Sequence, residues 1–293
     1  MRISIASGKG GTGKTTLAVN LAAYLALEHD VILTDLDVEE PNSGLFIHGK
    51  KIYEKSVYRM IPEWDSEKCS LCSLCTEVCA FHAISRIHND ILVFPKLCHS
   101  CYACSELCPD NALPMMQKKI GTLKQLESGR LTLIESILDI GEEQAVPLIQ
   151  QSIQYVDEQF AQETIKIFDA PPGTSCPMVE AVKQADSVIL ITEPTPVGLY
   201  DLQLAVETLQ ALHKNFAVVI NRSDIGNSDI LEFCRENQIP IITAIPHQRK
   251  IAEYYSRGEF LYQYIPEVKK ALDDILDYFK IQLTTSQKSR ALQ

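Results

Sequence analysis

Short runs of consecutive apolar residues, rich in β-branched side chains, alternate along most of this chain with stretches of helical periodicity. Uninterrupted apolar runs are typical of strands that are buried on both faces of a parallel sheet. Six runs predict such strands, at residues 2–7, 30–35, 164–169, 187–192, 216–221 and 241–245. Strands that alternate with helices form βαβ units, so the pattern predicts an α/β fold with a doubly wound, mostly parallel sheet.

Helical periodicity appears in several of the intervening stretches. Residues 17–27 are apolar on almost every side, which predicts a helix that other elements cover on both sides. Residues 142–160 and 202–213 alternate polar and apolar positions at helical spacing, and residues 123–135 suggest a hairpin around Gly129.

The helix predicted at residues 266–281 has one strongly apolar face. That face holds Val268, Leu272, Ile275, Leu276 and Phe279. The polar face carries three aspartates, at positions 273, 274 and 277, where an anionic lipid surface would favour Lys or Arg. We therefore expect this helix to pack against the core, with membrane targeting as the alternative.

The alternation of strands and helices stops in a cysteine-dense stretch. There, residues 68–84 align with residues 97–113 at an offset of 29 residues, including four cysteines in each half. Such a repeat predicts an inserted domain with internal pseudo-twofold symmetry. The predicted organisation is a discontinuous larger domain at 1–62 and 119–281, a small inserted domain at 63–118 and a polar tail at 282–293.

Composition and charge narrow the class of protein. A length of 293 residues suggests about two domains. The 38 acidic residues outnumber the 27 basic ones, and a net charge of −11 argues against a nucleic-acid partner. The absence of a long apolar run makes a membrane span unlikely, and the first residues lead straight into a predicted strand rather than a signal peptide. We expect a cytoplasmic protein, in which crowded cysteines bind metal rather than form disulfides.

A glycine-rich motif stands between the first predicted strand and the first predicted helix. It fits G-x-x-x-x-G-K-[ST] and consists of Gly8, Lys9, Gly10, Gly11, Thr12, Gly13, Lys14, Thr15 and Thr16. Glycines let successive backbone N–H groups surround phosphate oxygens at the positive end of a helix. Lys14 would contact the β- and γ-phosphates, and the Thr15 hydroxyl would bind Mg²⁺.

The extra lysine, Lys9, makes this loop resemble the deviant Walker A loop of the MinD, ParA and Mrp superfamily of ATPases. In that family, a second lysine reaches the phosphates of the facing subunit in a dimer that encloses ATP. The resemblance therefore implies ATP as the nucleotide, an ATP-dependent homodimer, and a catalytic role for Lys9 beside Lys14.

The resemblance continues at the ends of three later strands. It implies that Asp37 orients or activates the attacking water near Mg²⁺, that Asp169 holds Mg²⁺ through water, and that Asn221 contacts adenine. An aspartate at the end of a buried strand can instead simply cap the next turn. For Asp35, which precedes Asp37 by two residues, both interpretations are open.

The cysteines form two runs with the spacing C-x2-C-x2-C-x3-C, which matches bacterial ferredoxins. In such a run the fourth cysteine binds the other cluster, so the resemblance implies two [4Fe–4S] clusters in a small α+β ferredoxin-like domain. Cluster one would take Cys69, Cys72, Cys75 and Cys108, and cluster two would take Cys79, Cys98, Cys101 and Cys104. Zinc is the competing metal, but its usual pairs of C-x2-C knuckles leave the third cysteine of each run without a role.

Three further residues allow two interpretations each. His99 could donate an N–H···S bond to a cluster or face solvent. Cys176 lies close in sequence to the nucleotide motifs, yet a lone cysteine is more often a small buried apolar residue, and we expect that for both Cys176 and Cys234.

Together, the motifs favour an ATP-hydrolysing iron–sulfur protein in which nucleotide-dependent dimerisation gates electron transfer to an unidentified protein partner. One alternative is an iron–sulfur assembly or carrier ATPase of the Mrp type, which would pass clusters to an acceptor protein. Another is a MinD-like regulatory switch whose clusters act as redox sensors.

Overall fold

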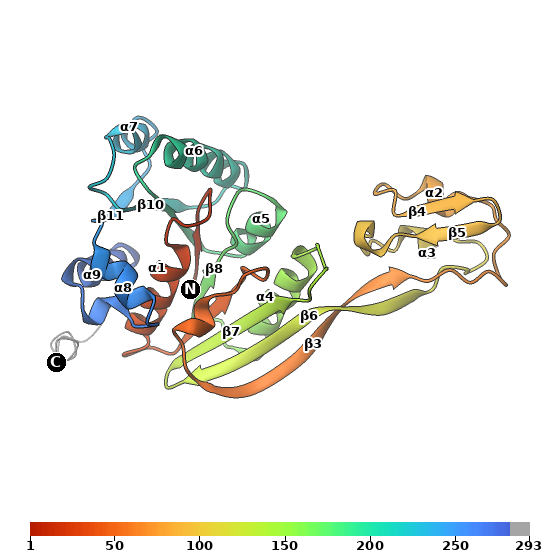
Figure 1. Ribbon diagram of the computed structural model, residues 1–293, viewed down its shortest axis with the longest axis horizontal. Coiled ribbons are helices and arrows are strands. Elements are labelled where there is room, and N and C mark those ends of the chain that lie inside the picture. The colour runs from red at the N-terminus through yellow and green to blue at the C-terminus, as the bar shows by residue number, and fades with distance from the viewer. Residues whose placement is uncertain (282–293) are drawn as a thin grey trace. The chain divides into compact units, whose positions relative to one another are not determined.

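The computed structural model describes residues 1–281, so the predicted tail at 282–293 lies outside the described residues (Figure 1). The strands are β1 (Arg2–Ala6), β2 (Val31–Asp35), β3 (Lys50–Pro62), β4 (Ile84–Ile87), β5 (Asp90–Val93), β6 (Met115–Ser128), β7 (Leu131–Leu138), β8 (Ile165–Asp169), β9 (Ser187–Thr192), β10 (Phe216–Asn221) and β11 (Ile241–Ile245). The α-helices are α1 (Lys14–Leu25), α2 (Leu74–Glu77), α3 (Ala103–Glu106), α4 (Val146–Gln159), α5 (Cys176–Lys183), α6 (Pro196–Ala211), α7 (Asp229–Glu236), α8 (Arg249–Tyr255) and α9 (Pro266–Phe279). Short 3₁₀ helices lie at Ser43–Leu45, Pro95–Leu97 and Leu261–Gln263.

Nine strands form one sheet in the order β11-β10-β9-β1-β8-β2-β7-β6-β3. The pairs from β11 to β7 are parallel, as expected for strands joined by helical crossovers. A link of only two residues, Gly129 and Arg130, joins β6 to β7 and makes the predicted hairpin. All six predicted strands are present, each within one residue of its predicted bounds. The prediction of a doubly wound, mostly parallel α/β sheet is thus confirmed.

Helices α1 and α9 belong to the core that covers this sheet. Most residues of α1 are buried, which confirms a helix covered on both sides. The apolar face of α9 is buried as well, and its acidic face is tied to the same unit, since Tyr24 donates to Asp273 at 2.8 Å and Thr243 donates to Asp274 at 2.7 Å. The interpretation of α9 as a core helix is therefore confirmed. Within residues 1–281, no helix combines the length and the apolar character needed to cross a bilayer.

Three helices begin at positions other than those predicted, and α1 starts at Lys14, three residues before the predicted start at 17. Helix α4 starts at Val146, four residues after the predicted start at 142. Helix α6 starts at Pro196, six residues before the predicted start, because the Thr195 hydroxyl accepts a 3.0 Å hydrogen bond from the Gly198 N–H and proline is well suited to the first helical position.

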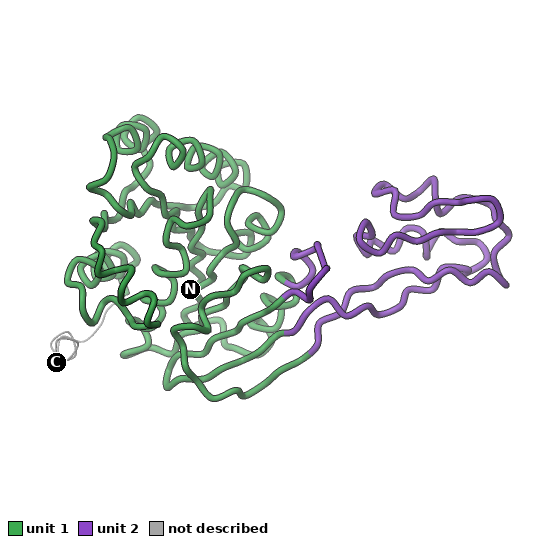
Figure 2. Tube along the Cα trace, in the orientation of Figure 1, with its two compact units in different colours: residues 1–55, 123–137, 149–293 green, residues 56–122, 138–148 purple. Residues whose placement is uncertain are grey.

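The chain forms two compact units (Figure 2). Within the described residues, unit 1 contains residues 1–55, 123–137 and 149–281, and unit 2 contains Ser56–Thr122 and Leu138–Leu148. Strands β3 and β6 contribute residues to both. Strand β3 was not predicted, because most of its first half is exposed and so lacks an apolar run.

Unit 2 has little apolar core of its own. Its β4–β5 hairpin packs with two small clusters of buried residues, one of which includes Cys104 and the other Cys98. Units of this size rarely bury enough apolar surface to be stable alone, and usually depend on disulfides or metal. Every cysteine of unit 2 is a free thiol in this structure.

Candidate functional site

The glycine-rich loop connects the end of β1 to the start of α1, as predicted. Gly13 adopts a left-handed conformation (φ 101°) directly before Lys14, the first residue of α1. A Cβ atom at Gly13 would lie 2.6 Å from the Asn221 side-chain nitrogen, which donates a 2.8 Å hydrogen bond to the carbonyl of Thr12. Glycine is therefore required here for both its backbone conformation and the space that it leaves.

We expect Gly13→Ala to weaken nucleotide binding, because it adds about 1–2 kcal/mol of backbone strain and also displaces Asn221 from the loop. Gly129→Ala is the matched control, since Gly129 also has a positive φ (63°) but nothing lies near its Cβ position. Both variants should lower thermal stability, whereas calorimetric titration with ATP should show weaker binding for Gly13→Ala alone. Equal affinities of the two variants would contradict the proposed role of the loop.

A pocket of about 460 Å³ opens above this loop in unit 1. Eight of the predicted nucleotide-site residues line it: Gly10, Gly11, Gly13, Lys14, Thr15, Thr16, Asp37 and Asn221. The sequence motifs did not predict the rest of the pocket lining, which follows β11 and includes Pro246, His247, Gln248, Ile251 and Tyr255. The signal that could have identified this wall is its position after a parallel strand, where ligands of such sheets usually bind.

Asp169 is another predicted site residue. It lies at the end of β8, directly beside Asp35 at the end of the adjacent strand β2. Asp35 is fully buried and accepts backbone N–H bonds from Asp37, Asn42 and Ser43 at 3.1, 3.0 and 2.9 Å. Its carboxylate therefore caps the following loop, which resolves the choice left open for this residue. Burial raises the pKa of Asp35 and, with the neighbouring carboxylate, that of Asp169.

Asp169 is a fully buried carboxylate at the end of β8. Both its oxygens are buried, and within the described residues they accept no hydrogen bond, although the Thr15 hydroxyl and Lys14 favour its charged form. Lys14 is 6% exposed, and burial lowers its pKa while Asp169, Asp37 and Asp35 oppose the shift. Mg²⁺ prefers such oxygen ligands and charge, so the donor set of Thr15, Asp37 and Asp169 fits this ion.

Asp37 lines the same pocket and is only partly buried. Burial, reinforced by the adjacent Asp35, raises the pKa of Asp37 to about 6. A carboxylate with this pKa can accept a proton near neutral pH, as a general base must.

Lys9 is not among the residues that line the 460 Å³ pocket. Its ammonium group forms an ion pair with Glu193, whose second oxygen accepts a 2.8 Å bond from Arg222. Glu193 is mostly buried between these two cations. Gly8 packs closely against Asp201, and a Cβ atom at Gly8 would clash with the backbone of Asp201.

The cysteines of unit 2 line two pockets, and each pocket takes three cysteines from one run and one from the other. One pocket is lined by Cys69, Cys72, Cys75 and Cys108, and the other by Cys79, Cys98, Cys101 and Cys104. These are the two sets that the sequence assigned to separate clusters.

The two cysteine runs also have the same backbone geometry, repeated at the offset of 29 residues. Left-handed backbone conformations recur at the paired positions Leu71 and Ser100, Ser73 and Tyr102, and His82 and Asn111. Backbone N–H groups contact sulfur in the same pattern, from Leu71 to Cys69 (3.4 Å), Ser100 to Cys98 (3.4 Å), Ala83 to Cys79 (3.3 Å) and Ala112 to Cys108 (3.2 Å). Such contacts stabilise thiolates. A left-handed backbone conformation at a residue other than glycine costs free energy, and such residues cluster at functional sites.

Each pocket is lined by four cysteines, the number of thiolates that a [4Fe–4S] cluster takes. Within residues 1–281, no group of three His, Cys, Asp or Glu side chains is placed to hold a single metal ion. In a cubane each of four thiolates binds a different iron, so the four sulfurs stand around the cluster rather than around a point. Burial and the other thiols of the same set raise the pKa of Cys75 and Cys104, to about 11 for Cys104. Loading with metal would therefore release protons.

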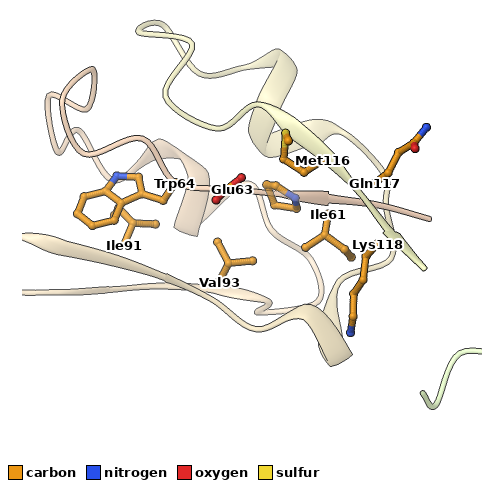
Figure 3. A pocket seen from close by; sticks show the side chains of 9 residues that line it. Ile61, Glu63, Trp64, Ile91, Val93, Met116, Gln117 and Lys118 are labelled. Atoms are coloured by element: carbon orange, nitrogen blue, oxygen red, sulfur yellow. The ribbon is translucent and has the colours of Figure 1, made fainter. Parts of the chain in front are cut away.

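An apolar pocket of about 330 Å³ adjoins the first cysteine pocket (Figure 3). Trp64 and Ile91 line both, so their side chains form a shared wall. Val93, Ile61 and Met116 line the rest of the 330 Å³ pocket together with the polar side chains of Glu63, Gln117 and Lys118.

The three remaining candidates have different outcomes. His99 is exposed and stacks on Phe81 with ring centroids 3.7 Å apart, which favours the solvent-facing interpretation. Cys234 is fully buried, as expected, and burial raises its pKa to about 11. The expectation for Cys176 is wrong, because this thiol is exposed at the start of α5, where the first turn of a helix meets solvent.

Comparison with known proteins identifies the family. The family model described as the CobQ/CobB/MinD/ParA nucleotide binding domain matches residues 3–261. An uncharacterized protein of Methanocaldococcus jannaschii is 27% identical over 95% of this chain and 97% of its own, and a second one from this organism is 32% identical over 78% and 80%. An iron–sulfur cluster carrier protein of Aquifex aeolicus is 23% identical over 88% of this chain and 60% of its own.

Solved structures show the same fold. The septum site-determining protein MinD of Pyrococcus horikoshii, complexed with Mg-ADP, has a TM-score of 0.59 at 17% identity, covering 95% of each chain. McdA of Cyanothece, in its complex with ATP, has a TM-score of 0.61 at 17% identity, covering 97% of this chain and 98% of its own. The sheet, the glycine loop at its centre and the family match agree, and this chain belongs to the CobQ/CobB/MinD/ParA family of P-loop nucleotide-binding proteins.

Proposed function

We propose that this chain is an ATP-hydrolysing iron–sulfur protein in which ATP-dependent dimerisation gates electron transfer through two [4Fe–4S] clusters to a protein partner. The observation that carries the proposal is the presence, in one chain, of a glycine-loop pocket and two pockets each lined by four free cysteines. Cysteine sets of this kind hold [4Fe–4S] clusters, which transfer single electrons.

The residues of the glycine-loop pocket have complementary roles in hydrolysis. Lys14 and the backbone N–H groups of the loop bind the phosphates, while Thr15 and Asp169 hold Mg²⁺. Mg²⁺ supplies positive charge that neutralises the phosphate oxygens. Asp37 lines the same pocket, where it would position the attacking water near Mg²⁺ and accept its proton.

The ion pair between Lys9 and Glu193 bears on dimerisation. In this structure, Glu193 holds Lys9 within its own chain. A lysine that binds the phosphates of a facing subunit must first leave this carboxylate. We infer that closure of the dimer exchanges Glu193 for ATP phosphates, so that nucleotide binding and dimerisation are coupled.

An anaerobic redox titration followed by electron paramagnetic resonance tests the proposal, with and without a non-hydrolysable ATP analogue. We expect the analogue to shift the midpoint potential of at least one cluster in the wild-type protein. The shift should disappear in Lys9→Ala, because that variant binds ATP but cannot close the dimer. Potentials that do not respond to nucleotide in the wild-type protein would contradict nucleotide gating by direct tuning of the clusters.

The alternative function is delivery of clusters to an acceptor protein. It is favoured by the similarity to a protein named as an iron–sulfur cluster carrier, at 23% identity. Complete sets of four cysteines disfavour it, because a fully ligated cluster has no open iron for an incoming thiolate. ATP-dependent transfer of iron to an apo-ferredoxin, measured after the two proteins are separated, would support delivery over electron transfer.

A further inference from the structure

Equivalent positions in the two repeats carry different charges beside the two cysteine pockets. Next to Cys69 in the first pocket, Ser70 donates both its N–H (3.1 Å) and its hydroxyl to the carboxylate of Asp110. At the equivalent positions beside the second pocket stand His99 and Phe81, whose rings stack on each other. A carboxylate thus flanks the first pocket where an aromatic pair flanks the second.

A buried cation lies beside the second pocket. Arg59 is 4% exposed, and its guanidinium donates to the carbonyls of Cys98 at 2.6 Å and Pro95 at 2.9 Å. Its remaining partners are Gln144, at 2.9 Å, and the carboxylate of Glu142, at 3.3 Å. The guanidinium therefore contacts the backbone of a cysteine that lines the second pocket.

The charges around Arg59 do not cancel. Glu142 balances one positive charge but is shared between Arg59 and Lys118, which it contacts at 2.6 Å. The group of three thus keeps one net positive charge. Burial keeps water away from Arg59, so its field is weakly screened.

Two other features would favour negative charge at the first pocket over the second, and their electrostatic effects are weaker than that of Arg59. Arg86 donates to the hydroxyl of Ser73 (2.9 Å) and to the carbonyl of Leu71 beside the first pocket, but it is exposed, and water screens its charge. Cys98 and Cys104 are each only 8% exposed, and burial disfavours the additional negative charge of a reduced cluster. The same burial strengthens the interaction with Arg59, which is in direct contact with the Cys98 backbone.

We propose that Arg59 and Asp110 give the two cluster sites different reduction potentials, the site of Cys79, Cys98, Cys101 and Cys104 having the higher one. The inference rests on the proposed function only in requiring that both clusters are present. Reduction adds one electron to a cluster, which a fixed cation stabilises and a fixed carboxylate opposes. A single electron supplied to the pair then resides at the second site, so electrons pass from the first site to the second.

The test is an anaerobic titration of the whole protein without nucleotide, with dithionite as the electron donor and electron paramagnetic resonance as the readout. The wild-type protein should show two one-electron steps at separate potentials. Arg59→Met should shift the higher-potential step downward and leave the lower one in place, whereas Arg59→Lys, which keeps the charge, should retain most of the wild-type value. Iron content is measured for each variant.

Asp110→Asn is an independent test, because Asp110 is partly exposed and Asn still accepts hydrogen bonds from Ser70. It should raise the lower-potential step alone. Coincident potentials in the wild-type protein, or a shift of the higher step in Asp110→Asn, would overturn the inference. These outcomes are distinct from a failure of nucleotide gating, which would leave two separate steps that do not respond to the ATP analogue.

Discussion

Lys14→Ala is expected to lower the rate of ATP hydrolysis by about 10²–10³-fold while the iron content stays at the wild-type level. Lys14 is 6% exposed at the first position of α1, in the pocket and close to three carboxylates. Removing its charge takes away the group that stabilises the negative charge of the phosphates in the transition state. Phosphate release under anaerobic conditions, together with an iron assay of the same sample, measures both quantities.

Lys250→Ala is the matched control for this experiment. Lys250 is an exposed lysine on α8, next to the pocket residue Ile251, but it does not line the pocket. Its removal should leave hydrolysis within about twofold of wild type, as is usual for an exposed side chain outside a site. Near-normal hydrolysis by Lys14→Ala would refute the assignment of the pocket, and loss of iron would mean that the substitution disturbs more than the nucleotide site.

Paired cysteine substitutions should lose either one cluster or both, depending on which pockets they affect. Cys75→Ala with Cys108→Ala removes two residues of one pocket, so about four of roughly eight irons should remain. Cys75→Ala with Cys79→Ala removes one residue from each pocket, and the iron content should fall towards zero. The three cysteines are exposed to a similar, intermediate degree, so the two pairs differ in pocket membership rather than in burial.

Cys176→Ala, which removes an exposed thiol outside both pockets, controls for general effects of losing a cysteine. It should keep the full iron content. Equal losses from the two double variants would show that the cysteines do not divide into these two sets. Zinc in place of iron after anaerobic preparation would instead support the competing metal.

Much of unit 1 could be predicted because its strands and its glycine loop are each encoded by a short, continuous stretch of sequence. The six predicted strands are buried on both faces, so each appears as a continuous apolar run, and the glycine loop needs particular residues at fixed spacing. Strand β3 lacked such a signal because most of its first half is exposed. The start of α6 was available in principle from the cap at Thr195 and the proline after it, but the apolar pattern begins only later.

In unit 2, the spacing of the cysteines is sufficient to predict the two cysteine sets but not the other residues beside them. The resemblance to ferredoxin spacing predicted which four cysteines line each pocket, because in such runs the fourth cysteine joins the first three of the other run. Nothing in the repeat predicted Arg59, which lies outside both cysteine runs and reaches Cys98 across 39 positions of sequence.

The sequence by itself determined the α/β fold class, the place of the glycine loop at the start of α1, and the division of eight cysteines into two sets. The first two features depend on backbone conformation and on periodic burial, which neighbouring residues dictate, and the third follows from the resemblance to ferredoxin spacing. Only the tertiary structure decided that Glu193 holds Lys9, that residues after β11 form the far wall of the pocket, and that a buried arginine flanks one cysteine set. Contacts between side chains distant in sequence leave no periodic trace, because they depend on how the finished elements pack.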